Sequence, residues 1–386
     1  MATPALIVGL GGTGVKVLTL VKQDLLATHG GRVPEEVQLL AFDTEAESDV
    51  QAGVAAASTA LGAAGVVKLE KEKGEYIWIG GNVRDYVRDV ARGKYPHVSS
   101  WLQAAYYLDT LPDALFYLEA GAGMLRQFGR LAIFYDVLKG AGLSKIYRMI
   151  RQALERVQRA KKGEAIQVIL VSSVAGGTGA GMFVDIAYLI RQIARLELRA
   201  SVTLRGFLVM PEAFSTIPTG VTRDMRARAY AAMRENKRFM VEPDWTDGYP
   251  MYYHGTERRG DGDDVWQGHV KSKVFDFLYH IDGRREKERL DTIPLELGVA
   301  PTIADTISAL LDEEGGRTFT QHQVNLNNAV QNAARTAFYG TVGTYTLVLP
   351  MYHITEDFAH RLTCLLYTSD AADDLLCVDL GGRRII

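Results

Sequence analysis

The feature that most restricts how this chain folds is a repeated order of apolar strand, glycine turn and helix. Its clearest example is VSSVAGGTGAGMFVDIAYLIRQ, residues Val171–Gln192. A second example opens the chain, where the apolar stretch Ala5–Val8 leads through Gly9–Gly14 into apolar residues at helical spacing. Strands that alternate with helices predict an α/β protein with a mainly parallel sheet and helices on both faces.

Other apolar segments predict further strands of this sheet, at Val37–Phe42, Tyr76–Ile79, Ala165–Ser173, Val202–Met210, Val274–Ile281 and Gly343–Leu349. Helices are predicted at Arg223–Met240, Thr302–Leu311 and Asn325–Phe338, among others. Two stretches, about 82–120 and 242–273, depart from the alternation and are predicted to be insertions.

Composition limits the class of protein. Hydrophobic residues make up 47% of the 386-residue chain, which is enough for one large core or two moderate ones. The formal net charge of −3 supplies no basic field, so no nucleic-acid partner is predicted. No apolar run approaches the roughly 20 residues that span a bilayer, and the first strand begins almost at Met1, where a signal peptide would lie. We therefore expect a cytoplasmic protein without a membrane segment.

The last residues, Cys364–Ile386, lack helical or strand periodicity. They match the translation of sequencing-adaptor DNA at two places in one reading frame, so we expect an artefactual tail and a natural sequence truncated near Thr363. Both cysteines lie in this tail, and the eight histidines are scattered. No disulfide, catalytic cysteine or metal site is predicted from these residues.

The glycine turns are candidate anion sites. In a parallel sheet, ligands lie beyond the carboxyl ends of the strands, where helix N-termini direct backbone N–H groups outward. The candidate residues of the two turns are Gly9, Gly11, Gly12, Thr13 and Gly14, and Ala175, Gly176, Gly177, Thr178, Gly179 and Gly181. Neither turn carries the lysine of a Walker loop. Two alternatives stay open: the glycines only permit tight turns, or Gly9–Gly14 and Asp43 bind NAD(P) in a Rossmann oxidoreductase.

Four motifs together resemble the tubulin/FtsZ superfamily, in particular its divergent bacterial members. VGLGGTG is similar to the family's first nucleotide loop, and AFDTEA, Ala41–Ala46, to the loop that FtsZ writes as NTDA. GAGMLRQFG, Gly121–Gly129, resembles the loop facing the terminal phosphate, and AGGTGAG, Ala175–Gly181, resembles the tubulin signature. The resemblance covers about Ala5 to Pro350 and implies a phosphate site that needs no loop lysine.

The resemblance also implies ligands and a domain organisation. GTP or GDP with Mg²⁺ would contact both turns and a further set of residues: Lys16, Asp43, Thr44, Gly121, Ala122, Gly123, Pro211, Arg223 and Asp282. Residues 1–290 would form the tubulin/FtsZ-type nucleotide-binding domain, and 291–363 a central helix and the start of a truncated second domain. Lys16 stands where FtsZ has asparagine, which leaves guanine and adenine both open.

The family's filaments assemble head to tail and complete catalysis in trans, so the implied partner is a second copy of this chain. QVNLNNAV, Gln323–Val330, is the nearest counterpart of the segment that supplies the acidic residues. Asn325 and Asn328 stand at the two acid positions, and an amide can orient water but cannot accept its proton. A GTPase and a non-hydrolysing nucleotide-binding scaffold are both consistent with this pattern.

Overall fold

The computed structural model describes residues 2–46, 67–119, 121–139, 144–214, 219–240, 249–250, 253, 269–283, 298–332, 339–341 and 355–363. The chain divides into two units, Met1–Gly343 and Thr344–Ile386. In the second unit the described part is a helix over residues 355–363 whose residues are exposed. The predicted artefactual tail lies outside the described residues.

One parallel sheet organises the first unit, with the strand order β3-β2-β1-β4-β5-β8-β9. Every neighbouring pair in it is parallel, from β1·β2 to β8·β9. The strands are β1 (Ala5–Leu10), β2 (Val37–Asp43), β3 (Tyr76–Trp78), β4 (Ile166–Ser173), β5 (Val202–Val209), β8 (Phe277–Ile281) and β9 (Tyr339–Gly340). The predicted parallel α/β fold is confirmed.

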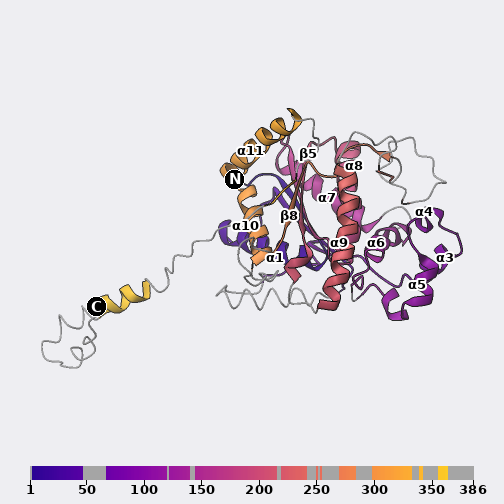
Figure 1. The fold of residues 1–386 in the computed structure, drawn as a ribbon. Coiled ribbons are helices and arrows are strands. Elements are labelled where there is room, and N and C mark those ends of the chain that lie inside the picture. Colours follow the sequence, from indigo (N-terminus) through magenta and orange to yellow (C-terminus); the bar gives the residue numbers. More distant parts are fainter. Residues whose placement is uncertain are drawn as a thin grey trace, which may run out of the picture. The chain divides into compact units, whose positions relative to one another are not determined.

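Helices cover both faces of this sheet (Figure 1). The described helices of the first unit are α1 (Gly11–Thr28), α3 (Arg84–Ala91), α4 (Pro96–Ser99), α5 (Ala104–Thr110), η1 (Asp113–Phe116), α6 (Arg126–Lys139), α7 (Lys145–Ala160), α8 (Thr178–Gln192), η2 (Ile193–Leu198), η3 (Pro211–Phe214), α9 (Thr219–Met240), α10 (Ala300–Leu311) and α11 (Glu313–Asn332). No helix in the described ranges is both long and apolar enough to cross a membrane.

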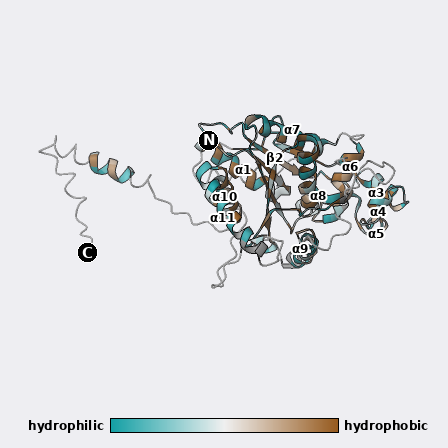
Figure 2. Ribbon diagram, turned by 90° about the horizontal axis from the view of Figure 1, so that it is seen from above, coloured by the Kyte–Doolittle hydropathy of each residue, from teal (hydrophilic) through white to brown (hydrophobic). Residues whose placement is uncertain are grey.

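Two hydrophobic clusters hold the layers together. Leu40 and Phe42 of β2 pack with α6, α7 and α8 on one face, whereas Leu39 and Ala41 pack with α1 and α10 on the other. This alternation follows from the two-residue period of a strand, which directs successive side chains to opposite faces. Figure 2 shows the same arrangement from above, with α1 and α10 on one side of the sheet and α8 on the other.

Several helices begin earlier than the sequence predicts, and α1 and α11 show the physical reason. α1 starts at Gly11, inside the predicted turn, because a φ of +67° at this glycine lets the chain pass directly from β1 into the helix. α11 starts at Glu313 rather than near Asn325. Asp312 Oδ2 accepts a hydrogen bond from the Gly315 N–H at 2.9 Å, which is the contact of an N-cap residue.

The two predicted insertions differ in how much is described. Residues 82–119 contain α3, α4, α5 and η1, whereas of 242–273 the structure describes the antiparallel pair β6 (Tyr249–Pro250) and β7 (His269–Val270), Tyr253 and the start of the approach to β8. The predicted strand Gly343–Leu349 lies outside the described residues, and β9 is the seventh strand of the sheet instead. The predicted domain boundary near residue 290 stays a prediction.

Candidate functional site at the carboxyl edge of the sheet

The carboxyl ends of the strands gather the predicted site residues at one edge of the sheet. Because all seven strands are parallel, the segments after β1, β2, β4, β5 and β8 leave the sheet on the same side. Each of these segments carries at least one of the predicted residues.

The first and second glycine turns are in contact. A Cβ atom added at Gly11 would lie 3.2 Å from the Gly179 nitrogen and 3.4 Å from the Thr178 Cβ. A Cβ atom at Gly179 would lie 2.8 Å from the Leu10 carbonyl oxygen, closer than real Cβ atoms come to other heavy atoms. The glycines thus allow two strand-to-helix turns to meet backbone against backbone.

The third turn, which leads into α6, packs on the second. A Cβ atom at Gly177 would lie 2.9 Å from the Leu125 nitrogen and 3.0 Å from the Ala122 Cβ. Gly121 and Gly123 have φ values of +89° and +53°, which are backbone conformations that favour glycine. Three turns that are far apart in the sequence therefore meet around the start of α8.

The end of β2 joins the same cluster through side chains. Thr44 Oγ1 and Thr178 Oγ1 are 2.6 Å apart and share a hydrogen bond. Asp43 Oδ1 accepts a hydrogen bond from the Thr44 N–H at 2.7 Å and one from the Glu45 N–H at 3.4 Å. The predicted residues Asp43, Thr44 and Thr178 are thus brought together.

Asp43 is an unusual carboxyl group. Its side chain is 3% exposed, and Oδ2 has no hydrogen-bond partner among the described residues. Burial raises its pKa to about 7, although the N–H groups of Glu45 and Thr44 act in the opposite direction. Around neutral pH this group changes charge next to the glycine turns.

The helix N-termini at this edge are suited to an anion. α1 and α8 have no acidic residue in the first turn and no side chain that caps the N-terminus. Their first N–H groups and the positive ends of their dipoles are therefore available to a bound anion. A Cβ atom added at Gly176 or Gly121 would meet no atom of the described residues within 4 Å, so these residues leave open space beside both glycines.

The remaining predicted residues are less closely joined. Lys16 and Gly12 are half-buried on α1, and Thr13 and Gly14 are buried there. Pro211 is buried in η3 after β5, and Arg223 is exposed near the start of α9. Asp282 is exposed directly after β8. The contribution of these residues to a site stays a prediction.

Asn325 and Asn328 lie at the opposite edge. Both are exposed on α11, whose Gly316 lies next to Thr3, before the start of β1. The eight residues of β4 span roughly 25 Å between the two edges, at about 3.3 Å per residue. Within one chain, the asparagines and the glycine turns are therefore separated by the full depth of the sheet.

Sequence reasoning missed residues that fix the turns in place. The Trp78 Nε1–H donates to the carbonyl oxygens of Thr44 at 3.2 Å and Leu118 at 3.1 Å. Ser173 Oγ accepts from the Ala175 N–H at 3.0 Å and donates to the Val209 carbonyl oxygen at 3.3 Å. Neither residue belongs to one of the four family motifs, and each one joins segments that only the strand order brings together.

The fold and this site define an α/β protein of the tubulin/FtsZ nucleotide-binding type. The sequence profile described as "Tubulin like" matches residues 6–365, and the chain belongs to this family. The predicted resemblance is thereby confirmed. No curated protein matches the chain in sequence.

Solved structures of tubulin-like proteins are similar to this chain at low identity. CetZ from Methanosaeta thermophila is 15% identical, with 81% of this chain and 56% of that chain covered and a TM-score of 0.37. The GTPγS-bound protofilament of Haloferax volcanii CetZ2 is 12% identical, with 81% and 60% covered and a TM-score of 0.36. The GTPγS-form protofilament of Bacillus thuringiensis TubZ is 15% identical, with 80% and 57% covered and a TM-score of 0.38. The chain spans 56–60% of the length of these structures.

Proposed function

We propose that this chain binds GTP or GDP at the three glycine turns and assembles head to tail as a tubulin-like filament subunit. The observation that carries the proposal is the meeting of Gly11, Gly177 and Thr178 at the N-terminus of α8, with open space beside Gly176. Membership of the tubulin-like family supports the choice of a guanine nucleotide. The similar proteins CetZ2 and TubZ form protofilaments with GTPγS, which supports self-assembly.

Backbone groups would hold the phosphates. The uncapped N-termini of α1 and α8 would donate N–H groups to phosphate oxygens, which removes the need for a loop lysine. The described residues contain no group of three His, Cys, Asp or Glu that would hold a metal ion unaided. Mg²⁺ would be held by the phosphates together with Asp43, whose Oδ2 has no hydrogen-bond partner among the described residues and could serve as a ligand.

The two edges of the sheet would meet between successive copies. Head-to-tail assembly would place α11 of one copy over the glycine turns of the next, and Asn325 and Asn328 are exposed on α11. Their amides would orient a water molecule, whereas deprotonation of that water would need another group.

Equilibrium titration with fluorescent GTP, ATP and NAD tests the nucleotide, and saturable binding that is tightest for GTP is expected. The decisive variant is Gly176→Ala, because its methyl group occupies open space in the protein and would collide with a bound phosphate. It should unfold like the wild type and bind GTP at least about tenfold more weakly, a loss of about 1.4 kcal/mol.

The matched control is Gly30→Ala, which adds a methyl group in open space away from the turns, at a φ of +62°. It should lose about 1 kcal/mol of stability and keep full affinity for GTP. Equal affinity of the Gly176→Ala variant and the wild type, or tighter binding of NAD than of GTP, would refute the proposal.

The second candidate function is a nucleotide-binding scaffold that does not hydrolyse GTP. The exposed amides of Asn325 and Asn328 at the acid positions favour it. Sedimentation and phosphate release, followed together, distinguish the two functions. Pelleting that depends on GTP without phosphate release identifies the scaffold, whereas release that rises with the pelleted fraction identifies a GTPase.

A further inference from the structure

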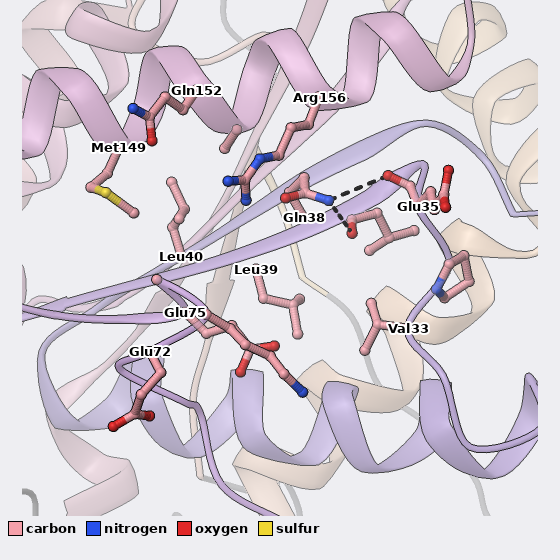
Figure 3. A pocket seen from close by; sticks show the side chains of 15 residues that line it. Val33, Glu35, Gln38, Leu39, Leu40, Glu72, Glu75, Met149, Gln152 and Arg156 are labelled. Atoms are coloured by element: carbon pink, nitrogen blue, oxygen red, sulfur yellow. Dashed lines mark hydrogen bonds between the residues drawn. The ribbon is translucent and has the colours of Figure 1, made fainter.

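A groove runs along the outer edge of β2, away from the glycine turns. It has a volume of about 460 Å³ and lies between α7 and the segment that precedes β3. Figure 3 shows it from close by. We name it the β2 edge groove and define it by six of its lining residues: Glu35, Gln38, Glu72, Met149, Gln152 and Arg156.

The groove exists because β3 is shorter than β2. β3 pairs with Ala41–Asp43 and leaves the first half of β2, from Val37 to Leu40, without a neighbouring strand on that side in the described part of the chain. The Ala41 N–H donates to the Glu75 carbonyl oxygen at 2.7 Å, so odd-numbered residues of β2 direct their peptide groups away from β1. The peptide group of Leu39 therefore points into the groove.

The other peptide groups on this edge already have partners. The Val37 N–H donates to the Pro34 carbonyl oxygen at 3.0 Å, and the Val37 carbonyl oxygen accepts from Gln38 Nε2 at 3.2 Å. For the N–H and C=O of Leu39, no hydrogen bond is found among the described residues. One donor and one acceptor are thus left open at the floor of the groove, as on the edge strands that accept an added strand.

The walls of the groove admit one extended chain. Met149, Gln152 and Arg156 of α7 form one side, and Gly74 lies against Met149 and closes the end next to β3. The edge strand of a second copy would need a longer open stretch, because β3 covers the rest of β2. The dimensions therefore favour a short peptide strand over the sheet of another copy.

The charges of the groove specify the peptide further. Glu35 and Glu72 are exposed at its two ends, and among the described residues neither carboxylate has an ion-pair partner. Two other charged lining residues, Lys73 and Glu75, are already in ion pairs. Arg156, also without an ion pair in the described part, lies on the wall between Glu35 and Glu72. A peptide with basic residues at both ends would place a cation beside each carboxylate and its carbonyl groups near Arg156.

We propose that the β2 edge groove binds a short extended peptide of a partner protein, with flanking lysine or arginine residues, as an added strand on β2. The Leu39 N–H donates to a carbonyl oxygen of the peptide, and the Leu39 carbonyl oxygen accepts from a peptide N–H. Glu35 and Glu72 select the basic ends. This site is independent of the proposed nucleotide site.

The test uses the full chain and a pool of pentapeptides with valine and threonine in the middle and lysine, glutamine or glutamate at both ends. Fluorescence anisotropy should show saturable binding in the order lysine, glutamine, glutamate. N-methylation of the central peptide nitrogens removes the donors needed for strand pairing and should weaken the lysine peptide at least about tenfold. The protein is unchanged in this comparison, so folding does not affect it.

Charge reversal then locates the site. Glu35→Lys with Glu72→Lys should weaken the lysine peptide at least about fivefold, whereas the control Asp109→Lys, which reverses an exposed acid on α5, should not. Gln152→Trp fills the groove from an exposed position and should abolish binding. Absence of saturable binding, equal affinity for lysine and glutamate peptides, or no effect of N-methylation would overturn the proposal. So would a self-associated state that Gln152→Trp dissociates, since the occupant would then be a second copy.

Discussion

At the carboxyl edge of the sheet, backbone meets backbone, whereas at the amino edge long side chains fill the space. The glycine turns touch at Gly11, Gly177 and Gly179, and the buried Oδ2 of Asp43 has no hydrogen-bond partner among the residues that the structure describes. At the amino edge, buried Arg205 donates to Gln323 Oε1 at 2.7 Å and to Gln167, and Gln323 donates to the Tyr279 hydroxyl. The polar side chains of the amino edge thus hydrogen-bond to one another, whereas the carboxyl edge has the uncapped N-termini of α1 and α8.

The two edges also differ in the charged group whose pKa is shifted by burial. Burial lowers the pKa of Arg205, although Tyr279 and Asp276 act in the opposite direction, and two glutamine oxygens accept hydrogen bonds from its guanidinium. At the other edge, burial raises the pKa of Asp43 to about 7. At the candidate site, a buried polar side chain keeps an atom without a hydrogen-bond partner among the described residues. At the amino edge, the buried polar side chains hydrogen-bond to one another.

The largest expected effect concerns Asp43. A carboxyl group with a folded pKa of about 7 and an unfolded pKa of about 3.9 binds more protons when folded, so its contribution to stability is full below pH 4 and is lost as the pH rises to about 7. The loss amounts to about 4 kcal/mol. Asp43→Asn removes this titration and should be less stable than the wild type at about pH 5 and more stable at about pH 8.

Urea unfolding at the two pH values measures this difference. The matched control is Asp282→Asn, an exposed aspartate at the same edge, which should shift stability equally at both. An Asp43→Asn variant whose stability relative to the wild type does not change with pH would show that the carboxyl group is not buried as described.

The second effect contrasts two glycines of the site. A Cβ atom at Gly129 would overlap the Gly177 carbonyl oxygen and lie 2.9 Å from the Thr178 Cα, so the backbone of α6 or of the turn must move. Gly129→Ala should cost about 3 kcal/mol and abolish nucleotide binding, whereas Gly176→Ala should cost almost nothing in stability. The midpoints of urea unfolding and a titration with GTP distinguish the two variants. If both variants lost the same stability, the close packing of α6 on the turn would be wrong.

A smaller effect is expected at the amino edge. Gln323→Leu leaves the buried guanidinium of Arg205 with one acceptor fewer and should cost about 2 kcal/mol. Gln321→Leu, on the exposed side of α11, is the control and should change stability by less than about 0.5 kcal/mol. Arg205→Met in the Gln323→Leu background should cost less than the sum of the single changes. Additive costs in chemical denaturation would show that the two side chains act separately.

The smallest effect is kinetic. If successive copies bring α11 to the glycine turns, Asn328→Asp supplies a proton acceptor and should raise phosphate release from GTP about tenfold, or about 1.4 kcal/mol in the barrier. Thr318→Glu places a carboxylate at an exposed position two turns before Asn325 on the same helix and should leave the rate unchanged. A rise in the Asn328→Asp rate that does not depend on protein concentration would contradict catalysis between copies.

Much of the fold was predictable from local pattern. The apolar runs at Val37–Phe42 and Val202–Met210 coincide with β2 and β5, within a residue at each end, because strand periodicity depends on neighbouring residues. The helix starts that depend on a capping side chain or on the conformation of a glycine were less predictable. Asp312 starts α11 well before the apolar pattern indicated a helix, and the φ of Gly11 shortens the first turn.

The sequence by itself determined the strand, turn and helix units and the glycines that their close packing requires. Which turns meet was decided by the tertiary structure, because contacts such as Thr44 with Thr178, or Gly177 with Ala122, depend on strand order across the sheet. The buried Oδ2 of Asp43 and the open Leu39 peptide arise in the same way, from the ends of neighbouring strands. Local periodicity encodes neighbours along the chain, and the burial of a polar atom depends on neighbours in space.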